Sequence, residues 1–182
     1  MLSAMVQSAD TLGFAKGPYF DSVESLRAVE DLYLTGTLYG FWKGPMMTAL
    51  AQAVPHLPRL ARFNLTQNTH CVDEEVAALV NGLARSTTLK ELILEGLAGL
   101  SGRRFPRTVQ AAADLLQRGG GAPLELLNLS KLSISDEDAA PLLAALPQSS
   151  LRHLWMFHSD LSSEAKQALR DAAPEGCDCS FD

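Results

Sequence analysis

One apolar pattern recurs five times along this chain of 182 residues. The pattern is L-x-x-L-x-L, in which Val, Met or Phe can replace a leucine, and successive copies begin 27 to 35 residues apart. Self-similarity at such a period is typical of repeat architectures and constrains the fold more than any single element does. The apolar positions of the copies are Val29, Leu32 and Leu34; Leu60, Phe63 and Leu65; Leu89, Leu92 and Leu94; Leu124, Leu127 and Leu129; and Leu151, Leu154 and Met156.

Each copy predicts a short strand that is followed by a helix. Apolar residues alternate within the hexamer, as in a strand, and then recur about every 3.6 residues, as in an amphipathic helix. Asp73, Asp136 and Ser162 stand where N-caps belong, and Ser135 with Asp138 matches a capping box. The residues expected on the inner side of the helices are Met46, Met47 and Leu50; Val76, Leu79, Val80 and Leu83; Val109, Ala112, Leu115 and Leu116; Leu142, Leu143 and Leu146; and Ala165, Ala168 and Leu169.

A single unit of strand and helix cannot bury its own apolar face, so neighbouring units must stack. We therefore predict an α/β solenoid, with a parallel inner sheet of about five strands and with helices outside. Five units span residues 29–175, an N-terminal capping segment that includes a helix spans residues 1–28, and a closing strand or tail spans residues 176–182. A Rossmann-like domain also alternates strands and helices and is the alternative fold.

Residues 29–182 resemble the leucine-rich repeat family, and the length of the units resembles its ribonuclease-inhibitor-like subfamily. Asn68 follows its strand at the place where the family has a turn asparagine. The resemblance implies a horseshoe-shaped repeat protein that binds other proteins. The chain departs from the family's asparagine ladder, because other residues occupy this place in the remaining units: Thr37, Leu97, Leu132 and Ser159.

Composition narrows the class of protein. The chain has 21 acidic and 15 basic residues, a net charge of -6, and 47% hydrophobic residues. This balance argues against a disordered chain and against a nonspecific nucleic-acid binder. No apolar run approaches the length of a membrane span, the N-terminus lacks a signal-peptide pattern, and three cysteines cannot all pair within one chain. We expect a cytoplasmic protein without nucleic-acid or membrane partners.

The alternation within each strand predicts which side chains point away from the helices. Trp155 and Tyr33 fall on this open face, where the core does not need them, and large aromatic side chains there are typical of interface hot spots. The alternatives are that a terminal segment of the chain or a second copy covers them. The expected partner-binding residues are Tyr33, Asn64, Glu91, Ile93, Glu95, Leu126, Asn128, His153, Trp155 and Phe157, together with Arg103 and Arg104 in a rim loop.

That rim loop follows a strand and precedes a helix, where anion sites occur. Its glycine spacing matches neither a P-loop nor G-x-G-x-x-G, which leaves a contact with an acidic partner or a solvated charged loop. Metal-ligand spacing and a nucleophile elbow are both missing from the sequence. Glu91 and Glu95 are the carboxylates that the pattern brings together, and N-glycosylation patterns at Asn64 and Asn128 fall on the open face, where we interpret them as chance matches.

These observations favour a noncatalytic module, a monomer or weak dimer, that binds a protein partner through its sheet face and rim loops without cofactor or metal. The alternative is a GTPase-activating protein, because one branch of ribonuclease-inhibitor-like proteins stimulates a small GTPase. Arg104 would then stabilise the charge of the transferred phosphoryl group. The chain has fewer units than that branch.

Overall fold

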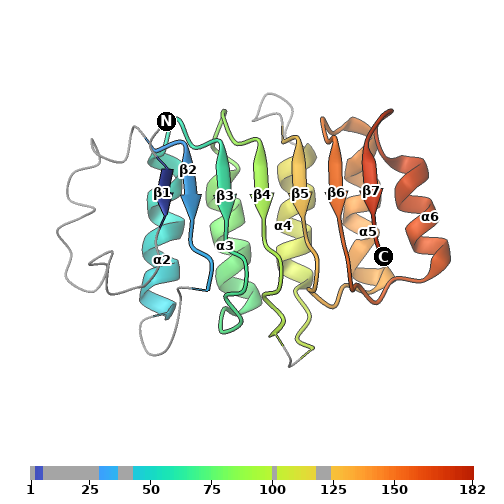
Figure 1. Cartoon of the computed structure of the whole chain (residues 1–182), viewed down its shortest axis with the longest axis horizontal. Helices are drawn as coiled ribbons and strands as arrows, with labels where there is room; N and C mark the ends of the chain where they lie inside the picture. The colour runs from blue at the N-terminus through green and yellow to red at the C-terminus, as the bar shows by residue number, and fades with distance from the viewer. Residues whose placement is uncertain (1–2, 6–28, 37–42, 100–101, 118–123) are drawn as a thin grey trace.

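The computed structural model describes residues 3–5, 29–36, 43–99, 102–117 and 124–182. Within these ranges, seven parallel strands form one sheet in which spatial order follows chain order (Figure 1). The strands are β1 (Ser3–Met5), β2 (Asp31–Tyr33), β3 (Arg62–Asn64), β4 (Glu91–Ile93), β5 (Leu126–Asn128), β6 (His153–Trp155) and β7 (Asp178–Ser180).

The described helices all lie on one side of this sheet, behind it in Figure 1. Each packs beside the next, and the short 3-10 helices η2 and η4 extend the ends of α2 and α5. None of the described helices is long and apolar enough to cross a membrane. They are α2 (Lys43–Ala53), η2 (Val54–His56), α3 (Asp73–Leu83), α4 (Pro106–Gln117), α5 (Asp136–Ala145), η4 (Leu146–Gln148) and α6 (Ser163–Ala172).

The mixed α/β architecture with a parallel sheet agrees with the sequence analysis. The middle residues of strands β2 to β6 lie side by side in register: Leu32, Phe63, Leu92, Leu127 and Leu154. A Rossmann-like domain would reverse its strand order and place helices on both faces. The sequential strand order and the single helix layer therefore exclude that alternative for the described residues.

The core fills the space between the sheet and the helix layer. The predicted strand residues Phe63, Leu92 and Leu127 are fully buried there, as are Val76 and Leu79 of α3. Leu143 of α5 was expected among them, but its side chain is 37% exposed. Successive residues lie about 100° apart around a helix, and in α5 this step carries Leu143 from the buried side of Leu142 toward solvent.

Besides the five repeat strands, the sheet contains β1 at one edge and β7 at the other, and β7 lies where the sequence analysis expects a closing strand or tail. β1 forms at residues 3–5, inside the segment that was expected to hold a capping helix, so that expectation is wrong for these residues. The apolar hexamer does not occur around these residues, and β1 pairs in parallel with β2. The rest of this segment, residues 6–28, lies outside the described residues. Residues 176–182 contain β7, whose following residue Phe181 is buried.

Acidic residues at the starts of α3 and α5 connect these two units to the units that follow them. Ser162 caps α6 and Ser135 caps α5 in a capping box with Asp138, as predicted. Asp73 and Asp136 are not the N-caps that the sequence analysis expected. The Asp73 carboxylate accepts hydrogen bonds from the backbone N–H groups of Arg107 (2.9 Å) and Thr108 (2.8 Å) in α4. The Asp136 carboxylate accepts from the Ser162 N–H at 2.8 Å, at the start of α6.

The chain turns in the same way after strands β2 to β6. The third residue after each strand has a left-handed backbone, with φ between 53° and 75°. Glycine adopts this conformation without strain, whereas other residues adopt it at a cost. Glycine stands at only two of the five turns, since the residues concerned are Gly36, Gln67, Gly96, Lys131 and His158.

The next residue of each turn is the position of the family's asparagine. Asn68 is buried, and its side-chain amide donates to the carbonyls of Leu34 at 2.6 Å and Leu65 at 2.8 Å. Leu97 and Leu132 bury an apolar side chain at this place instead. The Oγ of Ser159 is buried without a hydrogen-bond partner among the described residues. Thr37 lies outside the described residues.

Asn68 and Ser159 stand at equivalent positions of their turns, but only the Asn68 side chain has hydrogen bonds among the described residues. We therefore expect substitution by alanine to have opposite effects on stability at the two positions. We expect Asn68→Ala to lower the free energy of unfolding by about 2 to 3 kcal/mol, because the carbonyls of Leu34 and Leu65 lose the hydrogen bonds that the buried Asn68 amide donates. Ser159→Ala should leave that free energy unchanged or raise it by up to about 1 kcal/mol, because the hydroxyl has no hydrogen bond to lose in the described part of the chain. Urea denaturation followed by circular dichroism measures both, and equal losses would contradict the assigned roles.

Candidate functional site

The sheet presents an open surface on the side opposite the helices, which we call the sheet face. Its side chains flank the buried middle residues of the strands, and the register places them in rows. The first row is Asp31, Arg62, Glu91, Leu126, His153 and Asp178. The second row is Tyr33, Asn64, Ile93, Asn128, Trp155 and Ser180. Glu95, Ser130 and Phe157 stand two residues further along β4, β5 and β6.

The N-terminal end of the sheet face is a polar cluster around Arg62. Its guanidinium binds Glu91 at 3.0 Å and Asp31 at 3.5 Å. The hydrogen bond and the charge of Glu91 raise the pKa of Arg62 above its usual value, with further contributions from Tyr33 and Asp31. Glu91 is thus committed to an ion pair and does not form a catalytic carboxylate pair with Glu95.

The two asparagines of the sheet face stabilise the turns that follow their own strands. The side-chain oxygen of Asn64 accepts from the Thr66 N–H at 2.8 Å, and that of Asn128 accepts from the Ser130 N–H at 2.9 Å. Asn128 also donates to Glu95 at 3.4 Å and is only 4% exposed. Because of this burial, Asn128 shapes the face more than it offers a surface to a partner.

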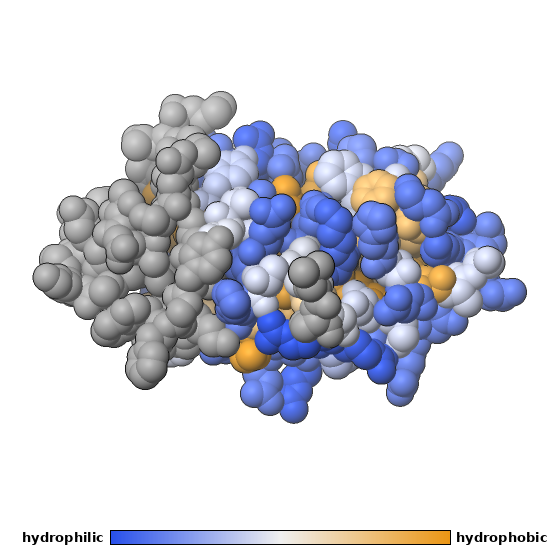
Figure 2. Space-filling model, turned by 60° about the horizontal axis from the view of Figure 1, so that its bottom comes forward, coloured by the Kyte–Doolittle hydropathy of each residue, from blue (hydrophilic) through white to orange (hydrophobic). Residues whose placement is uncertain are grey.

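An apolar patch occupies the C-terminal half of the sheet face, and we define it as Ile93, Leu126, Trp155 and Phe157. All four side chains are half-buried, so they are less open than the sequence analysis expected. The Trp155 ring lies 6.1 Å from the ring of His153, at a tilt of 54°. Figure 2 shows hydrophobic surface among hydrophilic surface toward this half of the molecule.

The rim-loop arginines do not join the sheet face. Arg103 donates to the backbone carbonyl of Thr69, in the loop before α3. Arg104 donates to Asp138 at 2.9 and 2.7 Å and to the hydroxyl of Ser135 at 2.5 Å, at the start of α5. These guanidiniums therefore connect neighbouring units, and their part in partner binding stays a prediction.

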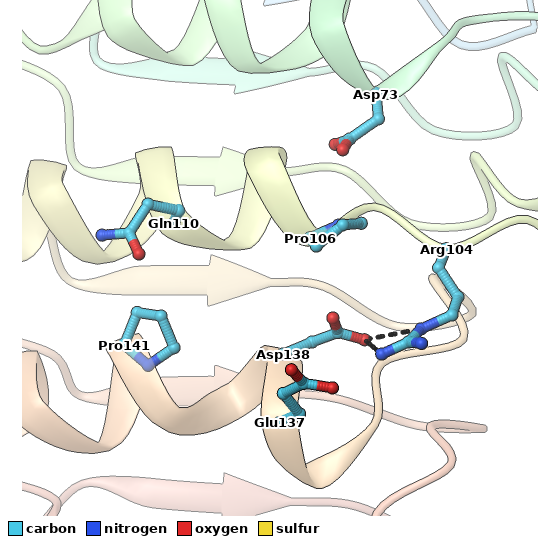
Figure 3. A pocket seen from close by; sticks show the side chains of 7 residues that line it. All are labelled: Asp73, Arg104, Pro106, Gln110, Glu137, Asp138 and Pro141. Carbon is cyan, nitrogen blue, oxygen red and sulfur yellow. Dashed lines mark hydrogen bonds and ion pairs between the residues drawn. The ribbon is translucent and has the colours of Figure 1, made fainter.

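A groove of about 630 Å³ opens beside Arg104, between the starts of α4 and α5 (Figure 3). Two of its three carboxylates are engaged in structural contacts: Asp73 binds the first turn of α4, and Asp138 binds Arg104 and Ser135. Glu137 is the third, so the groove does not offer a pair of free carboxylates. The residues that line it are Asp73, Arg104, Pro106, Gln110, Glu137, Asp138 and Pro141.

Opposing effects act on the Asp138 carboxyl. Burial alone would raise its pKa, but hydrogen bonds from Ser135 and the guanidinium of Arg104 outweigh burial and lower the pKa below its usual value. Asp138 is thus held as a carboxylate, and it links the start of α5 to Arg104 in the loop before α4.

The cysteines do not offer a reactive thiolate. Cys71 is buried in the core. The Sγ atoms of Cys177 and Cys179 lie 3.9 Å apart, and burial raises the pKa of both thiols, that of Cys179 to about 12. Among the described residues, no three His, Cys, Asp or Glu side chains gather in a way that could hold a metal ion.

The sequence analysis missed Asp178 as a member of the sheet face. The alternation of Cys177, Cys179 and Phe181 on the core side was the signal that could have placed it there. Its side chain is 60% exposed, and its carboxylate lies 3.8 Å from Nδ1 of His153.

Comparisons with known proteins relate the chain to others through its fold. No protein-family model matches the chain, and no curated protein matches its sequence. A solved structure of the actin-binding site 2 of leiomodin-1 is similar, with a TM-score of 0.56 and 13% identity over 79% of this chain and 80% of that one. The C-terminal domain of tropomodulin from Caenorhabditis elegans matches with a TM-score of 0.39 and 15% identity, over 74% of this chain and 62% of that one. The leiomodin-1 likeness shows a fold like that of leucine-rich repeats.

The lowered pKa of Asp138 predicts how stability depends on pH. The contribution of the Asp138 charge is present above the pKa of an unfolded aspartate, about 3.9, and is lost as the pH falls through the lower folded pKa. We expect Asp138→Asn to be less stable than the natural chain at pH 7 and this difference to shrink below about pH 4. Urea denaturation from pH 7 to pH 2.5 measures it. The exposed neighbour in Glu137→Gln is the control, and a difference independent of pH would contradict the assignment.

Proposed function

We propose that this chain is a noncatalytic protein-binding module that contacts its partner through the sheet face. The apolar patch is the observation that carries the proposal. Trp155 and Phe157 point away from a core that Leu154 and Met156, on the same strand segment, already fill. Apolar surface with aromatic side chains is typical of interaction sites, and aromatic residues dominate interface energies.

Several features of the candidate catalytic groups support the noncatalytic part of the proposal. The carboxylates of Glu91, Asp73 and Asp138 are engaged in structural contacts. The thiol of Cys179 is protonated at neutral pH, since its pKa is about 12. Arg104, which a GTPase-activating protein would need at the phosphoryl group, is bonded to Asp138 and Ser135, so the alternative function gains no support.

We further propose that the chain is a horseshoe-shaped repeat protein of the ribonuclease-inhibitor-like kind, a monomer or weak dimer that works in the cytoplasm. The consecutive parallel strands and the single helix layer support this assignment. The leiomodin-1 neighbour is named as an actin-binding site. This likeness extends to the fold alone, so it does not assign a partner to this chain. The neighbour's name makes actin the first defined partner to test.

The proposal is tested by truncating the apolar patch. We expect the double variant Trp155→Ala with Phe157→Ala to lose the partners that the natural chain captures by crosslinking in extract of the native host. Loss of one aromatic hot spot weakens an interface by about 30-fold or more. Purified actin, assayed by co-sedimentation, is the defined probe beside the extract.

The matched control is Val72→Ala with Leu143→Ala, which truncates two apolar side chains that are each 37% exposed outside the sheet face. This variant should capture the same partners as the natural chain. Circular dichroism and urea denaturation verify that both variants are folded. If the sheet-face variant retains every partner and the control variant loses them, the proposed face is wrong.

A further inference from the structure

The net charge of the molecule is concentrated in the part of the chain that carries most of the apolar patch. Residues 124–182 contain ten acidic and four basic residues and thus account for a charge of -6. The first 123 residues contain eleven of each kind and are neutral. The units of β5 to β7 therefore combine partly exposed aromatic surface with a negative field.

On the sheet face itself, the carboxylates outnumber the Arg and Lys side chains that pair with them. Arg62 serves both Asp31 and Glu91, and Lys131 pairs with Glu95 at 2.7 Å. Asp178 differs from these carboxylates, because its ion-pair partner is His153 at 3.8 Å, which is charged only when protonated. The Ser180 hydroxyl adds a long hydrogen bond of 3.4 Å to Asp178. An exposed negative charge thus remains at this end of the face.

This carboxylate and the Trp155 ring lie at the same end of the sheet face. Asp178 pairs in register with His153, and Trp155 is the next residue of β6 on that face. A cation that approaches here can form an ion pair with the carboxylate and a cation–π contact with an indole, which is the most favourable ring for such contacts. Phe157 and Leu126 offer apolar surface beside it.

We propose that the C-terminal half of the sheet face binds a protein segment in which a Lys or Arg side chain stands beside an aliphatic or aromatic anchor. This inference rests on the proposed function and specifies the chemistry of the partner. The anchor covers the apolar patch, and the cation lies between Asp178 and Trp155. A second copy of the chain is disfavoured as the occupant, because two surfaces with the same negative field repel each other.

A random 12-residue peptide library, displayed on phage and selected against the full chain at pH 7.5, tests this chemistry. We expect the selected peptides to be enriched in Lys and Arg next to apolar residues. The best peptide, synthesised with a fluorescent label, then gives dissociation constants by fluorescence anisotropy. Asp178→Asn should weaken its binding about five-fold, and this loss should vanish at high salt. Trp155→Ala should weaken its binding by 30-fold or more, about the loss of a hot spot.

Asp171→Asn is the matched control, because it makes the same change of charge on α6, in the helix layer. Its affinity for the peptide should equal that of the natural chain. Selected peptides that are acidic or neutral, or an empty selection, overturn the inference. If the affinity of the peptide depends on Trp155 but not on Asp178, the inference is overturned and the proposed function is left intact. A peptide that depends on neither, with partner capture unaffected by the patch variant, overturns both.

Discussion

The fold depends on apolar side chains that neighbouring repeat units bury between them. Leu92 in the middle of β4 lies between Phe63 and Leu127 in the sheet and contributes to a core that the helices close. Burying a side chain of this size stabilises a protein by roughly 1.5 to 3 kcal/mol. No unit provides its own cover, so the stability of each one depends on its neighbours. The hydrogen bonds of Asp73 and Asp136 also connect neighbouring units, because each carboxylate accepts from the start of the next unit's helix.

This construction leaves the sheet face free for function. Alternate residues of each strand supply the core, and the residues between them can change without opening it. In this chain they form two different surfaces, the paired charges around Arg62 and the apolar patch around Trp155. The charges around Arg62 pair with one another. The apolar patch and the neighbouring carboxylate of Asp178 remain partly exposed to solvent. This contrast is why we place partner binding at the C-terminal half.

The sequence predicts the part of the structure that apolar periodicity controls. The hexamer phase gives the register of β2 to β6, because misplacing one strand by a residue would expose its leucines. β1 was missed because the apolar hexamer does not occur around residues 3–5, where the strand pairs with β2. The left-handed turns at Gln67 and Lys131 carry no glycine signal. The contacts of Arg104 with residues 31 to 34 positions away depend on how the units stack, which composition and local pattern do not encode.

The central claim is that a partner protein covers the C-terminal half of the sheet face. Hydroxyl-radical footprinting by mass spectrometry tests it most directly, since oxidation of a side chain reports its access to solvent. The account predicts that a purified partner lowers the oxidation of Trp155 and Phe157 several-fold and leaves Leu143, in the helix layer, unchanged. Protection of Leu143 with unchanged oxidation of Trp155 and Phe157 would contradict it.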